Sequence, residues 1–172
     1  MKLDFATYAD TGFPMSAPQA KVLVISGIRD LAPESVPKLK TALHLALTML
    51  KPEVIRLGGA KGVDTEALKV LGDLETSPRL EVWLPCSIGD APIQSQLALP
   101  RADCVIELGR DPSRATSYLL RNKAMLDGAG GGREANALLA FTDGQRSGGT
   151  HRTIQAALKL GLPVYIVIVK RT

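Results

Sequence analysis

The chain has few aromatic residues and no long hydrophobic run. Phe, Trp and Tyr make up 4% of its 172 residues, which disfavours a stacking platform for nucleic-acid bases. A membrane-spanning helix needs about 20 consecutive apolar residues, and no apolar run approaches that length. The start of the chain also lacks the charged and then apolar pattern of a signal peptide. We therefore expect a soluble, cytoplasmic protein with no membrane partner.

Cysteine and histidine are also scarce. The two cysteines, Cys86 and Cys104, are too far apart for a C-x-x-C metal clamp, and neither has a histidine at the spacing of a metal ligand. We interpret both as reduced structural thiols. The sequence therefore predicts no metal site, and we expect no cofactor.

The charge of the chain is only mildly positive. Lys and Arg number 21 against 17 Asp and Glu, for a formal net charge of +4. This sum argues neither for nor against a nucleic-acid partner. The distribution is more informative, because Arg29, Lys61, Arg146 and Arg152 all lie in or beside glycine-rich turns. Positive charge is thus concentrated where an anion would bind.

Apolar periodicity predicts an alternation of strands and helices. Residues 21–26 form a continuous apolar run typical of a strand buried on both faces, and residues 35–50 show the three-and-four spacing of an amphipathic helix. The same reading predicts strands at 21–26, 53–57, 79–84, 136–141 and 163–169, and helices at 35–50, 64–74, 113–127 and 149–160. Such alternation implies right-handed crossovers. We predict an α/β fold with a doubly wound, largely parallel five-stranded sheet and helices on both faces.

The remaining segments lack this rhythm. Residues 1–20 show no sustained periodicity, so we expect an N-terminal arm or a short edge element there. Residues 85–112 carry four prolines and are interpreted as a long functional or lid-like loop, with one short element at 104–108. A chain of this length has room for one core, so residues 21–172 are expected to form a single domain.

Three glycine-rich turns follow predicted strands, at residues 26–30, 58–64 and 143–150. Glycine lets the backbone approach a ligand, and the following helix directs free N–H groups and a partial positive charge at the turn. Ligands of open parallel sheets bind beyond the carboxyl ends of the strands, where the strand order reverses. We expect the first strand in the centre, the second and third on one side, and the fourth and fifth on the other. The first and third turns then flank the reversal, and an anionic ligand is expected there.

Each turn also has a structural interpretation. Gly58 and Gly59 can serve tight packing of a strand on a helix, and Asp64 is well placed as an N-cap, which stabilises a helix by about 1 kcal/mol. The turn at 147–150 can likewise be an ordinary capped turn. However, a Gly-Gly-Thr sequence that opens directly into a helix presents several N–H groups and a hydroxyl to one anion. Both interpretations stay open from the residues alone.

Arg121 and Asn122 stand out in the helix predicted at 113–127. Apolar neighbours such as Leu119 and Met125 place this region on a buried stripe, where an arginine needs an anionic partner. That partner is either a carboxylate in a structural salt bridge or the phosphate of a ligand. We expect Asn122 to hold the neighbouring loop backbone through its amide.

Four ordered motifs resemble a known superfamily. They are Ser-Gly-x-Arg, Gly-Gly-Ala-Lys-Gly-Val-Asp, Arg-Asn-Lys-Ala-Met and Ala-Phe-x-x-Gly-x-x-Ser-Gly-Gly-Thr, followed by Gly-Leu-Pro-Val, and they span residues 21–168. In this order they resemble the Rossmann-like SLOG superfamily, which joins the DprA/Smf DNA-processing proteins with the LOG phosphoribohydrolases, and most of all its small single-domain YspA-like members. The resemblance implies a Rossmann-like fold, a nucleotide or nucleotide-derived ligand, and a homodimer.

The hydrolase branch of this superfamily carries a Pro-Gly-Gly-x-Gly-Thr-x-x-Glu motif together with an arginine from an earlier helix. In this chain Thr153 stands where that glutamate would be, while Arg121 matches the arginine. A threonine cannot supply the carboxylate that glycosidic hydrolysis requires. We therefore expect a binding protein rather than an enzyme, with N-glycosidic phosphoribohydrolase activity as an alternative.

The DprA branch binds single-stranded DNA and shares the Gly-x-Lys/Arg-Gly-x-Asp and Arg-Asn motifs. This second alternative is weaker, since Tyr118 alone among the aromatic residues lies near the basic cluster. We predict that the chain binds a nucleotide-type small molecule through its turns. The predicted ligand-binding residues are Ser26, Gly27, Arg29, Gly58, Gly59, Lys61, Gly62, Asp64, Arg121, Asn122, Gly144, Ser147, Gly148, Gly149 and Thr150.

Overall fold

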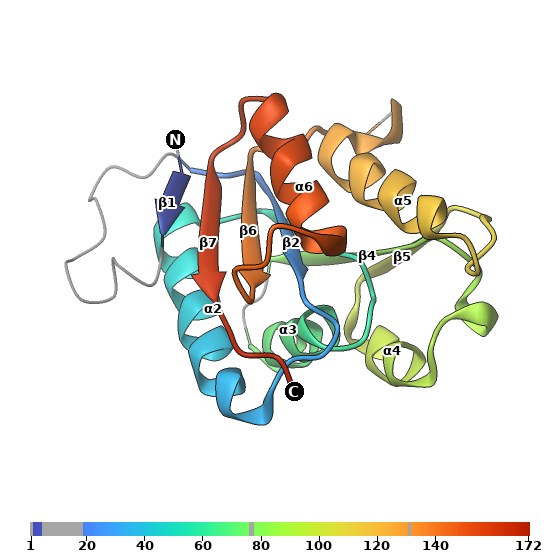
Figure 1. The fold of residues 1–172 in the computed structure, drawn as a ribbon, viewed down its shortest axis with the longest axis horizontal. Coiled ribbons are helices and arrows are strands. Elements are labelled where there is room, and N and C mark those ends of the chain that lie inside the picture. The colour runs from blue at the N-terminus through green and yellow to red at the C-terminus, as the bar shows by residue number, and fades with distance from the viewer. Residues whose placement is uncertain (1, 5–18, 76–77, 131) are drawn as a thin grey trace.

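Within the described residues, six parallel strands form the central sheet and a short seventh strand extends one edge (Figure 1). The computed structural model describes residues 2–4, 19–75, 78–130 and 132–172. The six strands are β2 (Val22–Gly27), β3 (Val54–Leu57), β4 (Arg79–Leu84), β5 (Cys104–Glu107), β6 (Ala137–Thr142) and β7 (Val164–Ile168). The short β1 (Lys2–Asp4) pairs in parallel with β7, so the order is β1-β7-β6-β2-β3-β4-β5.

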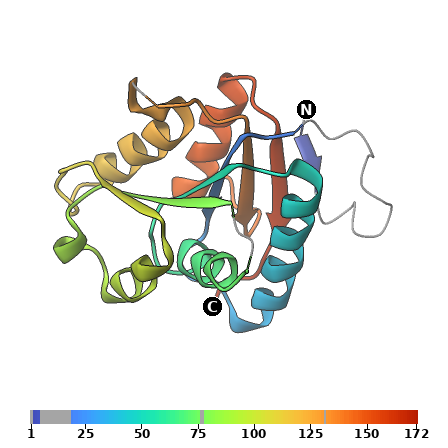
Figure 2. The same cartoon turned by 180° about the vertical axis from the view of Figure 1, so that it is seen from behind.

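Helices cover both faces of this sheet. They are α2 (Val36–Leu50), α3 (Val63–Gly72), α4 (Ile93–Ala98), α5 (Ala115–Asp127) and α6 (Gly148–Lys159), with short 3-10 turns η1 (Pro33–Ser35), η2 (Ile88–Asp90), η3 (Leu99–Arg101) and η4 (Gly128–Gly130). Figures 1 and 2 show α2 and α3 on one face and α5 and α6 on the other. In the described part of the chain, none of these helices has the length and apolar character that a membrane crossing needs.

The sheet divides the core into two layers, because successive side chains of a strand point to opposite faces. On β2, Leu23 and Ile25 pack in the layer that includes α2 and α3, whereas Val24 packs in the layer that includes α5 and α6. All three side chains are 0% exposed. The central strand of a parallel sheet is buried on both faces, which is why its sequence shows no alternation of apolar and polar residues.

The parallel, doubly wound, Rossmann-like architecture predicted from the sequence is confirmed, and the strand predicted at 21–26 is central. The predicted count of five strands is wrong. β5 lies at the short element predicted at 104–108 and adds a strand beyond β4. The strand has only four residues, so its apolar run is short. The rest of the 85–112 segment is not one long loop, because it also contains α4. Most of the predicted N-terminal arm, residues 5–18, lies outside the described residues.

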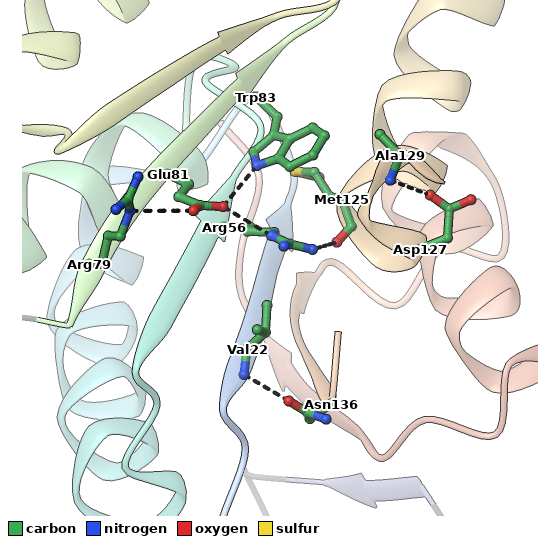
Figure 3. Close-up of polar contacts among 9 residues, drawn as sticks. All are labelled: Val22, Arg56, Arg79, Glu81, Trp83, Met125, Asp127, Ala129 and Asn136. Atoms are coloured by element: carbon green, nitrogen blue, oxygen red, sulfur yellow. Dashed lines mark hydrogen bonds and ion pairs between the residues drawn. The ribbon is translucent and has the colours of Figure 1, made fainter. Parts of the chain in front are cut away.

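A buried arginine joins β3, β4 and the end of α5 (Figure 3). Arg56 is 4% exposed, and it donates to Glu81 Oε2 at 3.2 Å and to the Met125 carbonyl oxygen at 2.9 Å. Its guanidinium lies 5.1 Å from the centroid of the Trp83 ring, whose Nε1 donates to the same carboxylate at 3.4 Å. Arg79 approaches that carboxylate at 3.4 Å from a more exposed position. The network holds the last turns of α5 against the sheet.

Arg56→Ala is expected to lower the free energy of unfolding by about 2 to 4 kcal/mol, because the buried Met125 carbonyl loses its donor and the Glu81 carboxylate loses its most buried cationic partner. Arg79→Ala is the matched control, since Arg79 pairs with the same carboxylate but is 59% exposed. It should cost less than about 1 kcal/mol. Urea denaturation followed by circular dichroism measures both, and equal losses would contradict the role given to the buried network.

Candidate functional site

A cleft opens at the carboxyl edge of the sheet, between the loops after β2 and β6, the start of α3 and one side of α5. Its volume is about 600 Å³, within the range of small-molecule sites. Here the strand order reverses, because β2 lies between β3 and β6. The described residues that line the cleft include four arginines and three aspartates. The cleft therefore lies at the place that the sequence predicts for a ligand.

The first turn of α6 forms one wall of the cleft. Ser147 is the N-cap residue but makes no side-chain capping hydrogen bond, so the first backbone N–H groups of the helix lack that acceptor. Gly148 has a φ of 85°, and a Cβ added at Gly148 or Gly149 would meet nothing within 4 Å. Thr150 lines the same wall. This turn presents free donors and open space to an anion.

Arg121 of α5 is buried at the opposite side of the cleft. Its Nη1 donates to the carbonyl oxygen of Gly58 and, at 3.2 Å, to that of Trp83. Its Nε has no hydrogen-bond partner among the described residues. A Cβ at Gly58 would overlap the guanidinium, so glycine at this position makes room for Arg121. Two backbone carbonyls, rather than a carboxylate at salt-bridge distance, thus hold Arg121.

Asp64 is the buried acid of the cleft. It lies in the first turn of α3, where its Oδ2 accepts the N–H of Ala60 at 3.1 Å, while its Oδ1 has no partner among the described residues. Burial raises the pKa of the Asp64 carboxyl, and the Arg121 guanidinium and the Ala60 N–H act against that rise. Burial likewise lowers the pKa of Arg121, which Asp64 opposes. The predicted N-cap role of Asp64 is wrong, because Gly62 is the N-cap of α3 and no side chain caps the helix. Asp64 instead accepts from Ala60, which precedes the helix, and its other oxygen is left without a partner among the described residues.

Asn122 contacts a side chain of α6 rather than the loop backbone that the sequence analysis expects it to hold. Its Nδ2 donates to Thr153 Oγ1 at 2.7 Å, and the Thr153 hydroxyl donates to the Gly149 carbonyl oxygen at 3.0 Å. Thr153 is 2% exposed. The position that carries the glutamate in the hydrolase branch is therefore used to fasten α6 to α5.

The rim of the cleft carries an aromatic ring between two arginines. The Arg29 guanidinium lies 4.4 Å from the centroid of the Tyr118 ring, and that of Arg121 lies 5.9 Å from it. Two other lining residues, Arg171 and Asp143, pair at 3.1 Å. The rim thus offers planar, positively charged groups beside a polar interior.

A second, smaller cavity of about 100 Å³ adjoins the cleft and shares Arg29 and Tyr118 with it. Gly58, Gly59 and Lys61 line this cavity rather than the main cleft. Lys61 pairs with Asp30 at 2.8 Å, and its hydrogen bond and charge hold the pKa of Asp30 below its usual value.

The structure gathers most of the predicted ligand-binding residues at one place. The main cleft is lined by Ser26, Gly27, Arg29, Asp64, Arg121, Asn122, Ser147, Gly148, Gly149 and Thr150. Gly62 and Gly144 line neither cavity. Gly62 has a φ of 83° and packs against the backbone of Arg29, so its role in the described structure is conformational.

Several residues that line the cleft are missing from the sequence-based set, among them Tyr118, Asp143 and Arg171. Asp143 follows the last residue of β6, and Arg171 follows β7 by three residues. Because the carboxyl ends of parallel strands meet at one edge of the sheet, the positions of Asp143 and Arg171 just after a strand could have predicted that they line the cleft. Tyr118 lies one helical turn before Arg121, which was the signal for its presence.

No family model matches the chain, and no curated protein matches it. Among solved structures, it is similar to DNA processing protein A from Helicobacter pylori, described for its single-stranded DNA binding mode, with a TM-score of 0.64 and 21% sequence identity. The match covers 87% of this chain and 66% of that chain. At this identity the likeness shows the fold alone, which agrees with the Rossmann-like fold that the resemblance implies. The nucleotide ligand and the homodimer stay predictions.

Gly58→Ala is expected to lower the free energy of unfolding by about 1 to 3 kcal/mol, because the added Cβ would displace the Arg121 guanidinium. In an Arg121→Ala background the same substitution should cost less than about 0.5 kcal/mol, since the space is then free. Chemical denaturation of the four proteins of this cycle measures the coupling. Additive losses would show that glycine is needed at position 58 for another reason.

Proposed function

We propose that the chain binds a nucleotide or nucleotide-derived ligand, with its phosphate against the first turn of α6. One observation carries the proposal. The cleft at the strand-order reversal contains two features. One is a helix N-terminus without a side-chain cap, and the other is a pair of buried polar side chains with atoms that lack partners within the described structure. A ligand with an anionic end and a polar, uncharged remainder matches both features.

The charges around the first turn of α6 favour an anion. The N-terminus of a helix carries a partial positive charge, and a phosphate there accepts hydrogen bonds from several backbone N–H groups at once. Arg152 lines the cleft two residues after Thr150, and Arg29 lines it as well. The carboxylate of Asp143 is paired with Arg171, which limits its repulsion of an incoming phosphate.

Binding without turnover is favoured over N-glycosidic hydrolysis. The hydrolase glutamate is replaced by Thr153, whose hydroxyl is engaged by Asn122 and Gly149. The turn of α6 that contains Thr153 therefore offers no acid to protonate a leaving base or to activate water. Three aspartates line the cleft. Asp30 is paired with Lys61 and Asp143 with Arg171, while Asp64 accepts a hydrogen bond from the Ala60 N–H.

Single-stranded DNA is the second candidate ligand. It is supported by the shared fold with a protein described for single-stranded DNA binding, and by the arginines of the cleft. Proteins of this kind stack successive bases on several aromatic side chains along a basic groove. Among the described residues that line the cleft, Tyr118 is the one aromatic side chain, and Arg29 lies over its ring. An enclosed mononucleotide fits this arrangement better than an extended strand.

Gly149→Asp is expected to weaken nucleotide binding by at least about tenfold, because a carboxylate at the helix N-terminus repels a phosphate and competes for its N–H donors. Gly149→Asn is the matched control, with the same size and no charge, and should weaken binding far less. Both side chains have room, since a Cβ at Gly149 meets nothing within 4 Å. Isothermal calorimetry with AMP, GMP, CMP and UMP measures the affinities.

Two results would contradict the proposed phosphate position. The absence of heat and of any thermal shift with all four nucleotides in the parent protein would refute nucleotide monophosphate binding. Equal losses in Gly149→Asp and Gly149→Asn would show that bulk matters there and charge does not. Because an acidic residue in the first turn favours a helix, loss of folding is not expected to explain weaker binding by Gly149→Asp.

An oligo-dT probe separates the second candidate from the first. If the chain binds nucleotides alone, the fluorescence anisotropy of labelled oligo-dT should not rise at low salt at micromolar protein. If it binds DNA, the anisotropy rises and the affinity falls steeply between 50 and about 200 mM salt, because phosphate contacts release counterions. Salt-sensitive binding that AMP does not displace would favour DNA over the mononucleotide.

A further inference from the structure

Two buried polar atoms on the same side of the cleft lack a partner among the described residues: Asp64 Oδ1 and Arg121 Nε. The two side chains are 5% and 4% exposed, and both line the cleft. They lie close enough for each charge to shift the pKa of the other. Buried polar atoms without partners are uncommon in folded proteins, so this pair points to a bound group that completes it.

The bound group must donate a hydrogen bond to the Asp64 carboxylate and accept one from the Arg121 guanidinium. A phosphate would satisfy the N–H of Arg121 but would be repelled by Asp64, and an amine would be repelled by Arg121. A hydroxyl both donates and accepts, so it suits Asp64 Oδ1 and Arg121 Nε alike. It also suits Asp64 in either protonation state. Two neighbouring hydroxyls on a sugar ring would give both atoms a hydrogen-bond partner.

The position of the pair fits the sugar of a nucleotide whose phosphate lies at α6. β6 and β3 flank β2, so the strands that lead to the turn before α6 and to the start of α3 lie about two strand spacings, roughly 10 Å, apart. In a nucleotide, the sugar is the group that follows the phosphate. The Arg29 guanidinium and the Tyr118 ring at the rim are then available to contact the base. Dinucleotide-binding sheets likewise use an acid beyond a neighbouring strand to bind ribose hydroxyls.

We propose that Asp64, supported by Arg121, binds the ribose hydroxyls of the ligand, so that the cleft selects ribonucleotides over deoxyribonucleotides. This inference rests on the proposed nucleotide function. It also gives Arg121 a different role from the phosphate contact that the sequence suggests, since the guanidinium is held at the Asp64 side of the cleft by the carbonyls of Gly58 and Trp83.

The test compares ligands that differ only in a sugar hydroxyl. Isothermal calorimetry is carried out with AMP, 2′-deoxy-AMP and 3′-deoxy-AMP, and with ribose 5-phosphate and 2-deoxyribose 5-phosphate as probes that lack a base. The parent protein should bind AMP about tenfold to hundredfold more tightly than at least one of its deoxy analogues, the range expected for a hydrogen bond to a charged group. Ribose 5-phosphate should show the same preference if the 2′-hydroxyl is the one bound.

Asp64→Asn should narrow that preference to within about threefold, since the amide keeps the shape and removes the charged acceptor. Asp73→Asn, at the exposed C-cap of the same helix, is the matched control and should keep the parent's preference. Thermal melting establishes that each variant is folded. The comparison of ligands on the parent protein needs no variant, so a failure of Asp64→Asn to fold does not prevent the test.

Each outcome separates this inference from the proposed function. If neither nucleotides nor sugar phosphates bind, nucleotide binding fails, and the ribose inference fails with it. If AMP and both deoxy analogues bind equally, the ribose inference is overturned while nucleotide binding stands. If the parent prefers AMP and Asp64→Asn keeps that preference, another residue recognises the sugar and the role given to Asp64 is overturned.

Discussion

The buried guanidinium of Arg121 is the contact on which the geometry of the cleft depends. From α5 it donates to the carbonyl oxygens of Gly58 and Trp83, at the carboxyl ends of β3 and β4. The next residue, Asn122, reaches α6 through Thr153. Successive residues of a helix point about 100° apart, so these two neighbours fasten α5 to both halves of the sheet across the reversal of strand order. The cleft is the space that α5, held in this way, leaves above the strand ends.

This arrangement buries polar atoms without hydrogen-bond partners at a place where a ligand can supply those partners. Arg121 and Asp64 are both buried, and each has one polar atom without a partner among the described residues. Such atoms destabilise a folded protein, because they lose water without gaining an equivalent hydrogen bond. A ligand that supplies the missing partners recovers this free energy on binding and stabilises the folded state. Residues that weaken the free protein can therefore be the ones that hold the ligand.

The glycines of the three turns fall into two groups according to their surroundings. A Cβ at Gly27, Gly58 or Gly62 would overlap a neighbouring side chain or backbone, so these glycines permit close packing beneath and beside the cleft. A Cβ at Gly148 or Gly149 would meet open space. The first group shapes the walls, and the second leaves the helix N-terminus accessible. The same sequence feature, a glycine-rich turn after a strand, thus serves packing in one place and access in another.

The sequence by itself determined the alternation of strands and helices, the parallel order, and the edge of the sheet where the turns gather. These follow from apolar periodicity within each segment and from the right-handed crossover. It also determined that Arg121, among apolar neighbours, needs a partner. Only the tertiary structure decided which partner, because Gly58 lies 63 residues from Arg121 and Thr153 lies 31 residues from Asn122. Such contacts arise when separate segments pack, and periodicity within a segment carries no record of them.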